Sequence, residues 1–570
     1  MTPSIAGHTD SPSYVHGANE RPFIGRTIGS FLDEAASRWP TRIAVVSRHQ
    51  NICWSYAEFK QEVDRFAAGL LTLGLRPGDR CGIWSPNNAE WILTQFAVAR
   101  IGVILVTINP AYRTSELEYA LNKAGCRALV LAERFKSSDY ISMLKELAPE
   151  LVSQPKAAFR CARLHSLEYV ICIGEPRLSA IWSFSDVHTL GSESEFRLAD
   201  EISARLQFDE AINIQFTSGT TGHPKGATLS HHNILNNGYF VGETLRLTDS
   251  DRLCLAVPLY HCFGMVMAVL GCLTHGSAIV IAAEAFEPRA VLTTIQTERC
   301  TVFYGVPTMF IAVLGDPEFA RFDLTSLRSG IMAGSPCPVE VMRKVITAMH
   351  MPEVTICYGM TETSPVSFQS AIEDPVERRV STVGRVHPHV EVKIVDEQGR
   401  VVPRGAPGEL LTRGYSVMLG YWDDAERTRE AIDPAGWMHT GDLAVIDEAD
   451  YCNIVGRIKD MVIRGGENIF PREVEEFLYT HPSVADVQVF GVFDPKYGEE
   501  LCAWIRLREG ANVDENAIRG FCEGKIARFK VPRYLRFVEG FPMTVTGKVQ
   551  KFVMRQEMHE SLGLKPETTA

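Results

Sequence analysis

The sequence lacks the features that mark membrane and secreted proteins. Its densest apolar run, Cys262 to Leu273, is far shorter than the roughly 20 residues that a membrane-spanning helix needs. Residues 1–19 are polar and mixed, without the apolar core of a secretory signal peptide. The last four residues, Glu567 to Ala570, do not form a peroxisomal address. We therefore expect no integral membrane association and no export.

Basic clusters and cysteine pairs are missing as well. The formal net charge is -12 and no block of Lys and Arg interrupts the sequence, which argues against a nucleic-acid-binding protein. The 14 cysteines include no C-x-x-C pair, so neither a zinc ribbon nor a disulfide scaffold is expected. Reduced thiols are typical of cytosolic proteins, and we predict a cytoplasmic location.

The first two thirds of the chain alternate strand-like and helix-like segments. Ser55-x-x-Glu58 forms a capping box in front of apolar residues at helical spacing. Ser115-x-x-Glu118 repeats this signal before a strand at Ala128 to Leu131. Such alternation predicts an α/β fold with largely parallel sheets that helices cover on both faces.

Length and pattern predict more than one domain. At 570 residues the chain is too long for a single hydrophobic core. Short alternating strands indicate a β-rich subdomain at about 384–457, and the last segment has strands and helices of its own. Residues 151–200 are less regular, with a Ser-rich loop near Gly191 to Glu195. The expected parts are a tail at 1–22, a large N-terminal domain at 23–457 and a smaller α+β C-terminal domain at 458–570.

One loop has the composition of a phosphate-binding site. The stretch Thr217-Ser218-Gly219-Thr220-Thr221-Gly222-His223-Pro224-Lys225-Gly226 follows an apolar strand, Ile212 to Phe216. Its glycines let the backbone approach a ligand, its hydroxyls offer donors, and its lysine adds positive charge. It is not the common P-loop, because Gly219 and Gly222 stand three apart and Lys225 precedes Gly226. A flexible polar connection would not explain the lysine.

Two further stretches have the composition of a nucleotide site. In Tyr358-Gly359-Met360-Thr361-Glu362, the ring can stack on a base, the hydroxyl can meet a phosphate and the carboxylate can hold Mg²⁺. The same five residues could instead form a turn with a solvated glutamate. In Trp437-Met438-His439-Thr440-Gly441-Asp442, the final acid can accept both ribose hydroxyls, or it can merely close a turn.

These stretches, in this order and between about Phe23 and Glu560, resemble the adenylate-forming superfamily. That superfamily includes acyl-CoA synthetases, nonribosomal-peptide adenylation domains and beetle luciferases. The resemblance implies that the protein uses a carboxylic acid, ATP, Mg²⁺ and coenzyme A as co-substrate. It implies two steps, in which the acid and ATP form an acyl-adenylate and coenzyme A then displaces AMP. It also implies a mobile C-terminal domain, with Lys459 at the hinge position.

The resemblance further implies roles for individual residues. Lys548 matches the catalytic lysine, whose ammonium can draw a carboxylate and an α-phosphate together. His261 matches the gate between the acyl pocket and the nucleotide, although a satisfied core histidine would look the same. Gly466 matches the lining of the tunnel for coenzyme A. Thr361 and Glu362 join Lys548 and His261 as catalytic residues, and Glu362 and Thr217 are the implied Mg²⁺ ligands. The implied nucleotide-binding residues are Thr217, Ser218, Gly219, Thr220, Thr221, Gly222, Lys225, Gly334, Ser335, Pro336, Tyr358, Gly359, Asp442 and Arg457.

The stretch after the gate indicates the acyl substrate. It forms an uncharged apolar run and predicts a buried helix that lines a pocket for an apolar acid. The string from Tyr358 to Pro365 also resembles the medium-chain branch of the superfamily. We predict a medium-chain fatty acid, with an aryl acid or a short-chain thioether acid as the alternative. The run consists mainly of Phe263, Met265, Val266, Met267, Val269 and Leu270.

Other classes fit less well. A peptide-synthetase adenylation domain would need an Asp near the gate, and Tyr260 to Phe263 supplies none. An acyl-AMP ligase that loads a carrier protein would carry an insertion after the hinge, and Arg457 to Glu473 runs without one. A binding module would not need Lys548. A catalytic pair of His261 and Cys262 is not expected, because adjacent residues of an extended segment face opposite ways. The sequence leaves a homodimer open.

Overall fold

The computed structural model describes residues 11–176, 178–217, 224–335, 337–464, 467–544 and 549–564. Its contacts divide the chain into two compact units. The larger unit consists of residues 16–391 and 412–438, and the smaller unit consists of residues 1–15, 392–411 and 439–570. Within the described residues, no helix combines the length and the hydropathy that crossing a bilayer requires.

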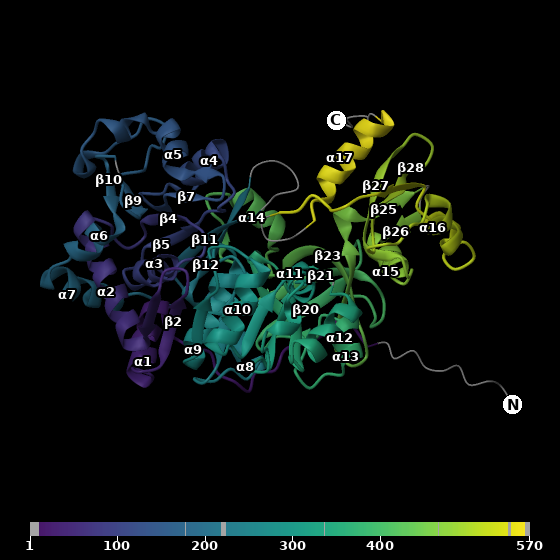
Figure 1. Ribbon diagram of the computed structural model, residues 1–570, viewed down its shortest axis with the longest axis horizontal. Coiled ribbons are helices and arrows are strands. Elements are labelled where there is room, and N and C mark those ends of the chain that lie inside the picture. Colours follow the sequence, from purple (N-terminus) through teal and green to yellow (C-terminus); the bar gives the residue numbers. More distant parts are fainter. Residues whose placement is uncertain are drawn as a thin grey trace. The chain divides into compact units, whose positions relative to one another are not determined.

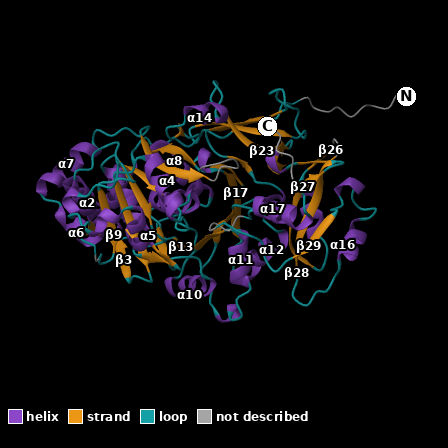
Figure 2. Cartoon of the chain, turned by 90° about the horizontal axis from the view of Figure 1, so that it is seen from above, coloured by secondary structure: helices purple, strands orange, loops and turns teal. Residues whose placement is uncertain are grey.

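The larger unit is built on two large mixed sheets (Figures 1 and 2). The neighbouring strands of each sheet are parallel except at the ends of the order, where β12, β22, β3, β18 and β19 pair antiparallel. The eight-stranded sheet has the order β10 (Ile181–Ser183), β9 (Tyr169–Ile173), β6 (Ala128–Ala132), β4 (Arg80–Trp84), β5 (Ile104–Thr107), β11 (Ala211–Thr217), β12 (Lys225–Ser230) and β22 (Gly420–Tyr421). The nine-stranded sheet has the order β19 (Arg385–Val386), β18 (Val366–Gln369), β17 (Glu353–Gly359), β16 (Ser329–Ala333), β15 (Val302–Gly305), β13 (Arg252–Leu255), β14 (Ala278–Ile281), β2 (Ile43–Ser47) and β3 (Ile52–Ser55).

Helices surround both sheets, and one hydrophobic core joins them. Cys81 of β4 and Leu253 of β13 belong to the same buried cluster as Phe66 and Phe96 of two intervening helices. The predicted α/β class with parallel sheets is thereby confirmed. A small hairpin of β7 (Arg134–Phe135) and β8 (Ser138–Asp139) lies outside the two sheets. The helices are α1 (Ile28–Arg38), α2 (Tyr56–Leu73), α3 (Ala89–Arg100), α4 (Thr114–Ala124), α5 (Tyr140–Leu147), α6 (Phe184–Leu190), α7 (Glu193–Ser203), α8 (His231–Thr244), α9 (Gly271–His275), α10 (Pro288–Glu298), α11 (Pro307–Leu314), α12 (Val339–Ala348), α13 (Val376–Ser381) and α14 (Ala425–Ala431).

Helix starts follow the capping rules, but not always at the predicted residue. The box at Ser55 and Glu58 is confirmed, with each side chain bonded to the other's backbone N–H. The predicted box at Ser115 is wrong, because the Glu116 carboxylate accepts from the backbone of Arg113 and the helix starts earlier. The predicted Ser-rich loop is also wrong in part, because Ser192 is the N-cap of α7.

The smaller unit contains two further sheets. One contains most strands of the predicted β-rich region. Its order is β1 (Tyr14–His16), β20 (Val390–Val395), β21 (Gly408–Gly414), β23 (Met438–Ile446) and β24 (Cys452–Arg457). The other has the order β26 (Glu467–Ile469), β25 (Val462–Arg464), β28 (Gly498–Leu507) and β27 (Val484–Asp494), with β29 (Tyr534–Phe537) also paired to β28. Its helices are α15 (Pro471–Tyr479), α16 (Glu515–Cys522) and α17 (Lys551–Leu562).

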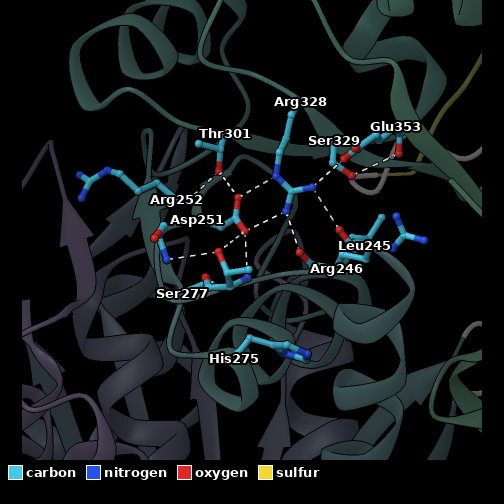
Figure 3. Close-up of polar contacts among 12 residues, drawn as sticks. Leu245, Arg246, Asp251, Arg252, His275, Ser277, Thr301, Arg328, Ser329 and Glu353 are labelled. Carbon is cyan, nitrogen blue, oxygen red and sulfur yellow. Dashed lines mark hydrogen bonds and ion pairs between the residues drawn. The ribbon is translucent and has the colours of Figure 1, made fainter.

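An ion pair between the half-buried Arg328 and the buried Asp251 connects the amino ends of the central strands of the nine-stranded sheet (Figure 3). Arg328, just before β16, donates two hydrogen bonds to Asp251, at 3.0 and 2.8 Å, and one to Glu353 at 2.6 Å. Its other two N–H groups reach the carbonyl oxygens of Leu245 and Arg246, so all five guanidinium donors are used. Thr301, just before β15, donates to the same aspartate at 2.7 Å.

Replacing Arg328 by methionine is expected to destabilise the larger unit by about 3 kcal/mol, because the Asp251 carboxylate would stay buried without its cation. The side chain of Asp251 is only 5% exposed. The apparent melting temperature measures the loss. The exposed pair of Arg343 and Glu340 is the control, and Arg343→Met should leave the melting temperature unchanged. Equal melting of the two variants would contradict a stabilising role for Arg328.

The same pair has a pH signature. Burial raises the pKa of Asp251, but hydrogen bonds from Arg328 and Thr301 outweigh burial and leave this pKa below its usual value. A lowered carboxyl pKa adds stability that is fully present above the unfolded pKa of about 3.9 and is lost as the pH falls through the folded pKa. The melting temperature of the wild type should therefore decrease as the pH is lowered below about 3.9.

Candidate active site

Two of the predicted nucleotide segments meet at the carboxyl ends of neighbouring parallel strands. β16 and β17 pair with Ala333 opposite Cys357, so Gly334 and Ser335 leave the sheet beside Tyr358 and Gly359. Ligands of open α/β sheets bind at such strand ends. The structure thus brings together two segments that lie more than twenty residues apart in the sequence, and both contain residues that the resemblance assigns to the nucleotide.

Two of these positions accept only glycine. A side chain at Gly359 would collide with the carbonyl oxygen of Pro365, which accepts the backbone N–H of Met360 at 3.0 Å. Gly334 has a φ of +93°, a left-handed conformation that other residues rarely adopt. Gly359 therefore lets the Pro365 backbone approach β17 closely, and Gly334 lets the chain turn after β16.

The two ends of the phosphate-type loop are held by a strand pair. β11 and β12 run antiparallel with Thr217 opposite Lys225. The Lys225 ammonium lies 4.6 Å from the ring centroid of Tyr421 on β22, the next strand of the sheet. Tyr119 of α4 donates to the carbonyl oxygen of Pro224 at 3.1 Å, and this residue was not anticipated from the sequence. The predicted residues Ser218, Gly219, Thr220, Thr221 and Gly222 lie outside the described residues.

Glu362 joins the two large sheets. It sits in a short 3-10 turn, Thr361–Thr363, after β17, and is only 6% exposed, which is not a solvated turn glutamate. Its Oε1 accepts hydrogen bonds from the Tyr421 hydroxyl at 2.9 Å and from the Thr217 hydroxyl at 3.2 Å. The carboxylate therefore lies beside the end of the phosphate-type loop, as its predicted role requires.

Tyr421, like Tyr119, is a residue of this site that the sequence did not reveal. Burial raises the pKa of its hydroxyl, and the nearby Glu362 carboxylate raises it further, so the hydroxyl remains a donor at neutral pH. It lies 59 residues after Glu362, in a strand of two residues. No local pattern distinguishes it from other tyrosines, and only its pairing with β12 brings it to the carboxylate.

The oxygen atoms of this cluster fit a magnesium ion. Mg²⁺ in nucleotide sites is usually held by one or two carboxylates together with substrate phosphates and water. Glu362 offers a buried carboxylate, and the Thr217 hydroxyl lies 3.2 Å from it at the start of the phosphate-type loop. Both predicted ligands are therefore in one place, with oxygen chemistry that suits the ion.

His261 lies where the apolar run begins. Its half-buried ring accepts the backbone N–H of Phe263 at Nδ1, 3.2 Å away. Cys262 Sγ is 3.6 Å from the same nitrogen and 3.9 Å from the Thr361 hydroxyl oxygen. The expectation that His261 and Cys262 face apart is wrong, because the chain enters a helix here and is not extended. Cys262, the neighbour of the predicted gate residue, thus approaches the Thr361 turn.

The apolar run is helical and buried, as predicted, but it winds as a π-helix, Phe263–Leu270, followed by α9. All of its residues are buried. The ring of Phe263 stacks against Tyr304 of β15 with centroids 5.8 Å apart. π-helical segments are rare and are often found at functional sites. This wall offers apolar side chains and no charge.

Asp442 and Arg457 lie in the smaller unit and contact each other. They are opposite residues of β23 and β24, and Arg457 Nε donates to Asp442 Oδ1 at 3.0 Å. The Asp442 side chain is 8% exposed, whereas that of Arg457 is 64% exposed. Two of the residues that the resemblance assigns to the nucleotide are therefore neighbours. Pro336, Gly466 and Lys548 lie outside the described residues, and their roles stay predictions.

Comparison with known proteins agrees with this geometry. A family profile described as AMP-binding enzyme matches residues 32–422, and one described as AMP-binding enzyme C-terminal domain matches residues 473–548. A Danio rerio protein named medium-chain acyl-CoA ligase ACSF2, mitochondrial, is 47% identical over 98% of this chain and 94% of its own length. A Bacillus subtilis protein named as an acyl-CoA synthetase, YngI, is 47% identical over 95% of this chain and 98% of its own. The crystal structure of ATP-bound MatB from Rhodopseudomonas palustris superposes with a TM-score of 0.81, at 28% identity, over 95% of this chain and all of that one.

The comparison also corrects one prediction. The zebrafish relative is named as mitochondrial, which contradicts the predicted cytoplasmic location. All 14 cysteines are free. The prediction rested on reduced thiols, which do not tell one reducing compartment from another. The family profile covers well over half of the chain, and the relatives match it nearly from end to end. The chain belongs to the AMP-binding enzyme family.

Proposed function

We propose that this protein is an ATP-dependent, AMP-forming acyl-CoA synthetase that acts on a medium-chain fatty acid. In the first step a carboxylate oxygen attacks the α-phosphorus of ATP, and the bond to the β-phosphate breaks to release pyrophosphate. In the second step the coenzyme A sulfur, having lost its proton, attacks the acyl carbonyl, and the acyl-adenylate bond breaks to release AMP.

One observation carries this proposal: the buried Glu362 carboxylate is hydrogen-bonded to the end of the phosphate-type loop. Thr217 and Lys225 flank that loop, and Glu362 is held in place by the hydroxyls of Thr217 and Tyr421. A bound Mg²⁺ would neutralise the phosphate charge there, with Glu362 and Thr217 as its protein partners. A buried carboxylate is costly even when it is hydrogen-bonded, and a bound cation would offset that cost.

The remaining roles follow the family resemblance. Lys548 supplies positive charge to the transition state of the first step, and Asp442 with Arg457 holds the ribose. Coenzyme A reaches the acyl-adenylate past Gly466. The domain boundary is proposed at 457/458, next to the hinge residue Lys459.

The apolar wall supports the choice of acid. The π-helix Phe263–Leu270 presents only buried apolar and glycine residues, and Tyr304 stacks against its first ring. Apolar surface of this kind favours an alkyl chain over a small polar acid. The zebrafish relative is named for medium-chain acids, which supports the same choice over an aryl or thioether acid.

An AMP-release assay over a chain-length series of straight acids, with aryl and thioether acids included, tests the function. We expect AMP only when acid, ATP, Mg²⁺ and coenzyme A are all present, with the highest kcat/KM for a medium-chain acid. A preference for an aryl acid would favour the alternative substrate. Adenylate that forms but is never passed to coenzyme A would favour a carrier-loading ligase, and no AMP from any acid would refute the proposal.

A further inference from the structure

Helix α17 is attached to the edge strand of a sheet by a regular row of polar contacts. β27 is the last strand in the order of its sheet, and α17 lies beside it (Figures 1 and 2). Lys551 donates to the carbonyl oxygen of Val489 at 2.9 Å, Arg555 donates to that of Gly491 at 2.9 Å, and His559 accepts the N–H of Phe493 at 3.0 Å.

The spacing explains why the contacts form a row. The three helix residues are four apart and so lie on one face, whereas the three strand residues are two apart and so point the same way. In an antiparallel pair the backbone groups of alternate residues face away from the partner strand and need other partners. Side chains of α17 therefore satisfy the outer edge of β27.

The first contact of the row differs from the others because it includes an ion pair. Lys551 also donates to the Glu475 carboxylate of α15 at 2.6 Å, and that carboxylate accepts the backbone N–H of Val489 at 2.8 Å. The Glu475 side chain is 9% exposed. One buried carboxylate, one ammonium and one strand residue thus lock α15, α17 and β27 together.

Lys551 also lies directly after the segment that carries Lys548, which is three residues earlier in the sequence. The chain on both sides of that segment is paired, since Met543 bridges to Val549 and Gln550 donates to the carbonyl oxygen of Pro542 at 2.9 Å. Lys551 follows this paired stem directly and attaches it to the sheet. The helix itself keeps an independent anchor, because Met554 and Met558 are buried against the sheet.

We propose that Lys551 is a positioning residue for the adenylation half-reaction. Its bonds to Glu475 and Val489 hold the root of the Lys548 segment in register with the sheet, and this inference rests on the role proposed for Lys548. Misplacing a catalytic group by about 1 Å can cost about 100-fold in rate. Loss of Lys551 should therefore slow the step that uses Lys548 and spare the step that does not.

The test compares Lys551→Met and Arg555→Met in the full-length protein. Each removes one contact of the row to a backbone carbonyl, and both should lower the melting temperature. Only Lys551→Met should lower kcat for acid-dependent pyrophosphate exchange, by about 10- to 100-fold with little change in KM for ATP. Thioester formation from supplied acyl-adenylate should stay at the wild-type rate. Lys551→Arg, which keeps the charge, should restore much of the exchange.

Other outcomes separate the inference from the proposed function. Equal losses of exchange in Lys551→Met and Arg555→Met, or equal losses of both half-reactions in Lys551→Met, would show a merely structural role and overturn the inference. Lys548→Ala is assayed in parallel. If Lys548→Ala loses exchange while Lys551→Met keeps it, the inference alone fails. If Lys548→Ala keeps exchange, the role proposed for Lys548 fails and the inference fails with it.

Discussion

Replacing Lys548 by alanine is expected to abolish acyl-adenylate formation. A single ammonium that stabilises developing charge is typically worth about 10²–10³-fold in kcat, and here it must also draw two anions together. Acid-dependent exchange of labelled pyrophosphate into ATP measures this step alone. Thioester formation from supplied acyl-adenylate should persist, because the second step forms no new bond to the α-phosphate.

The matched control for this variant is Lys525→Ala, another lysine of the smaller unit with an exposed side chain. It should leave both half-reactions at wild-type rates. If Lys548→Ala lost both half-reactions together, its role would not be specific to adenylation. If it retained exchange, the assignment of the catalytic lysine would be wrong.

Replacing Glu362 by glutamine should give the second large effect, a loss of about 100-fold or more in adenylation. The amide keeps the size of the side chain and can still accept from Thr217 and Tyr421, so the fold should be retained. It lacks the charge that a magnesium ion requires. The rate of pyrophosphate exchange, measured against Mg²⁺ concentration, should be low and should need more of the ion.

Tyr421→Phe is the control for Glu362. It removes one hydroxyl that donates to the same oxygen atom but leaves the carboxylate charge and the ring over which Lys225 lies. We expect a smaller loss than in Glu362→Gln and little change in Mg²⁺ dependence. Wild-type exchange by Glu362→Gln at ordinary Mg²⁺ concentrations would contradict a metal-binding role.

The rules for helix capping and apolar spacing predicted the structure correctly where the interactions are between residues close in sequence. The capping box at Ser55 and the buried run from Phe263 to Leu270 involve residues one or two turns apart, and both are present. The same rules failed where two local choices competed. Glu116 took the capping role expected of Glu118, which instead pairs with Arg163 of a distant loop.

The sequence by itself determined the fold class, the family and the segments that end beside one another, because alternating strands and helices force parallel strands whose carboxyl ends share an edge. Only the tertiary structure decided what Glu362 contacts. A hydrogen bond depends on distance in space, and strand order placed Tyr421 and Thr217, from another sheet, against this carboxylate. The same holds for Lys551, whose partners Glu475 and Val489 are remote in sequence and are brought to it by the packing of a helix on a strand edge.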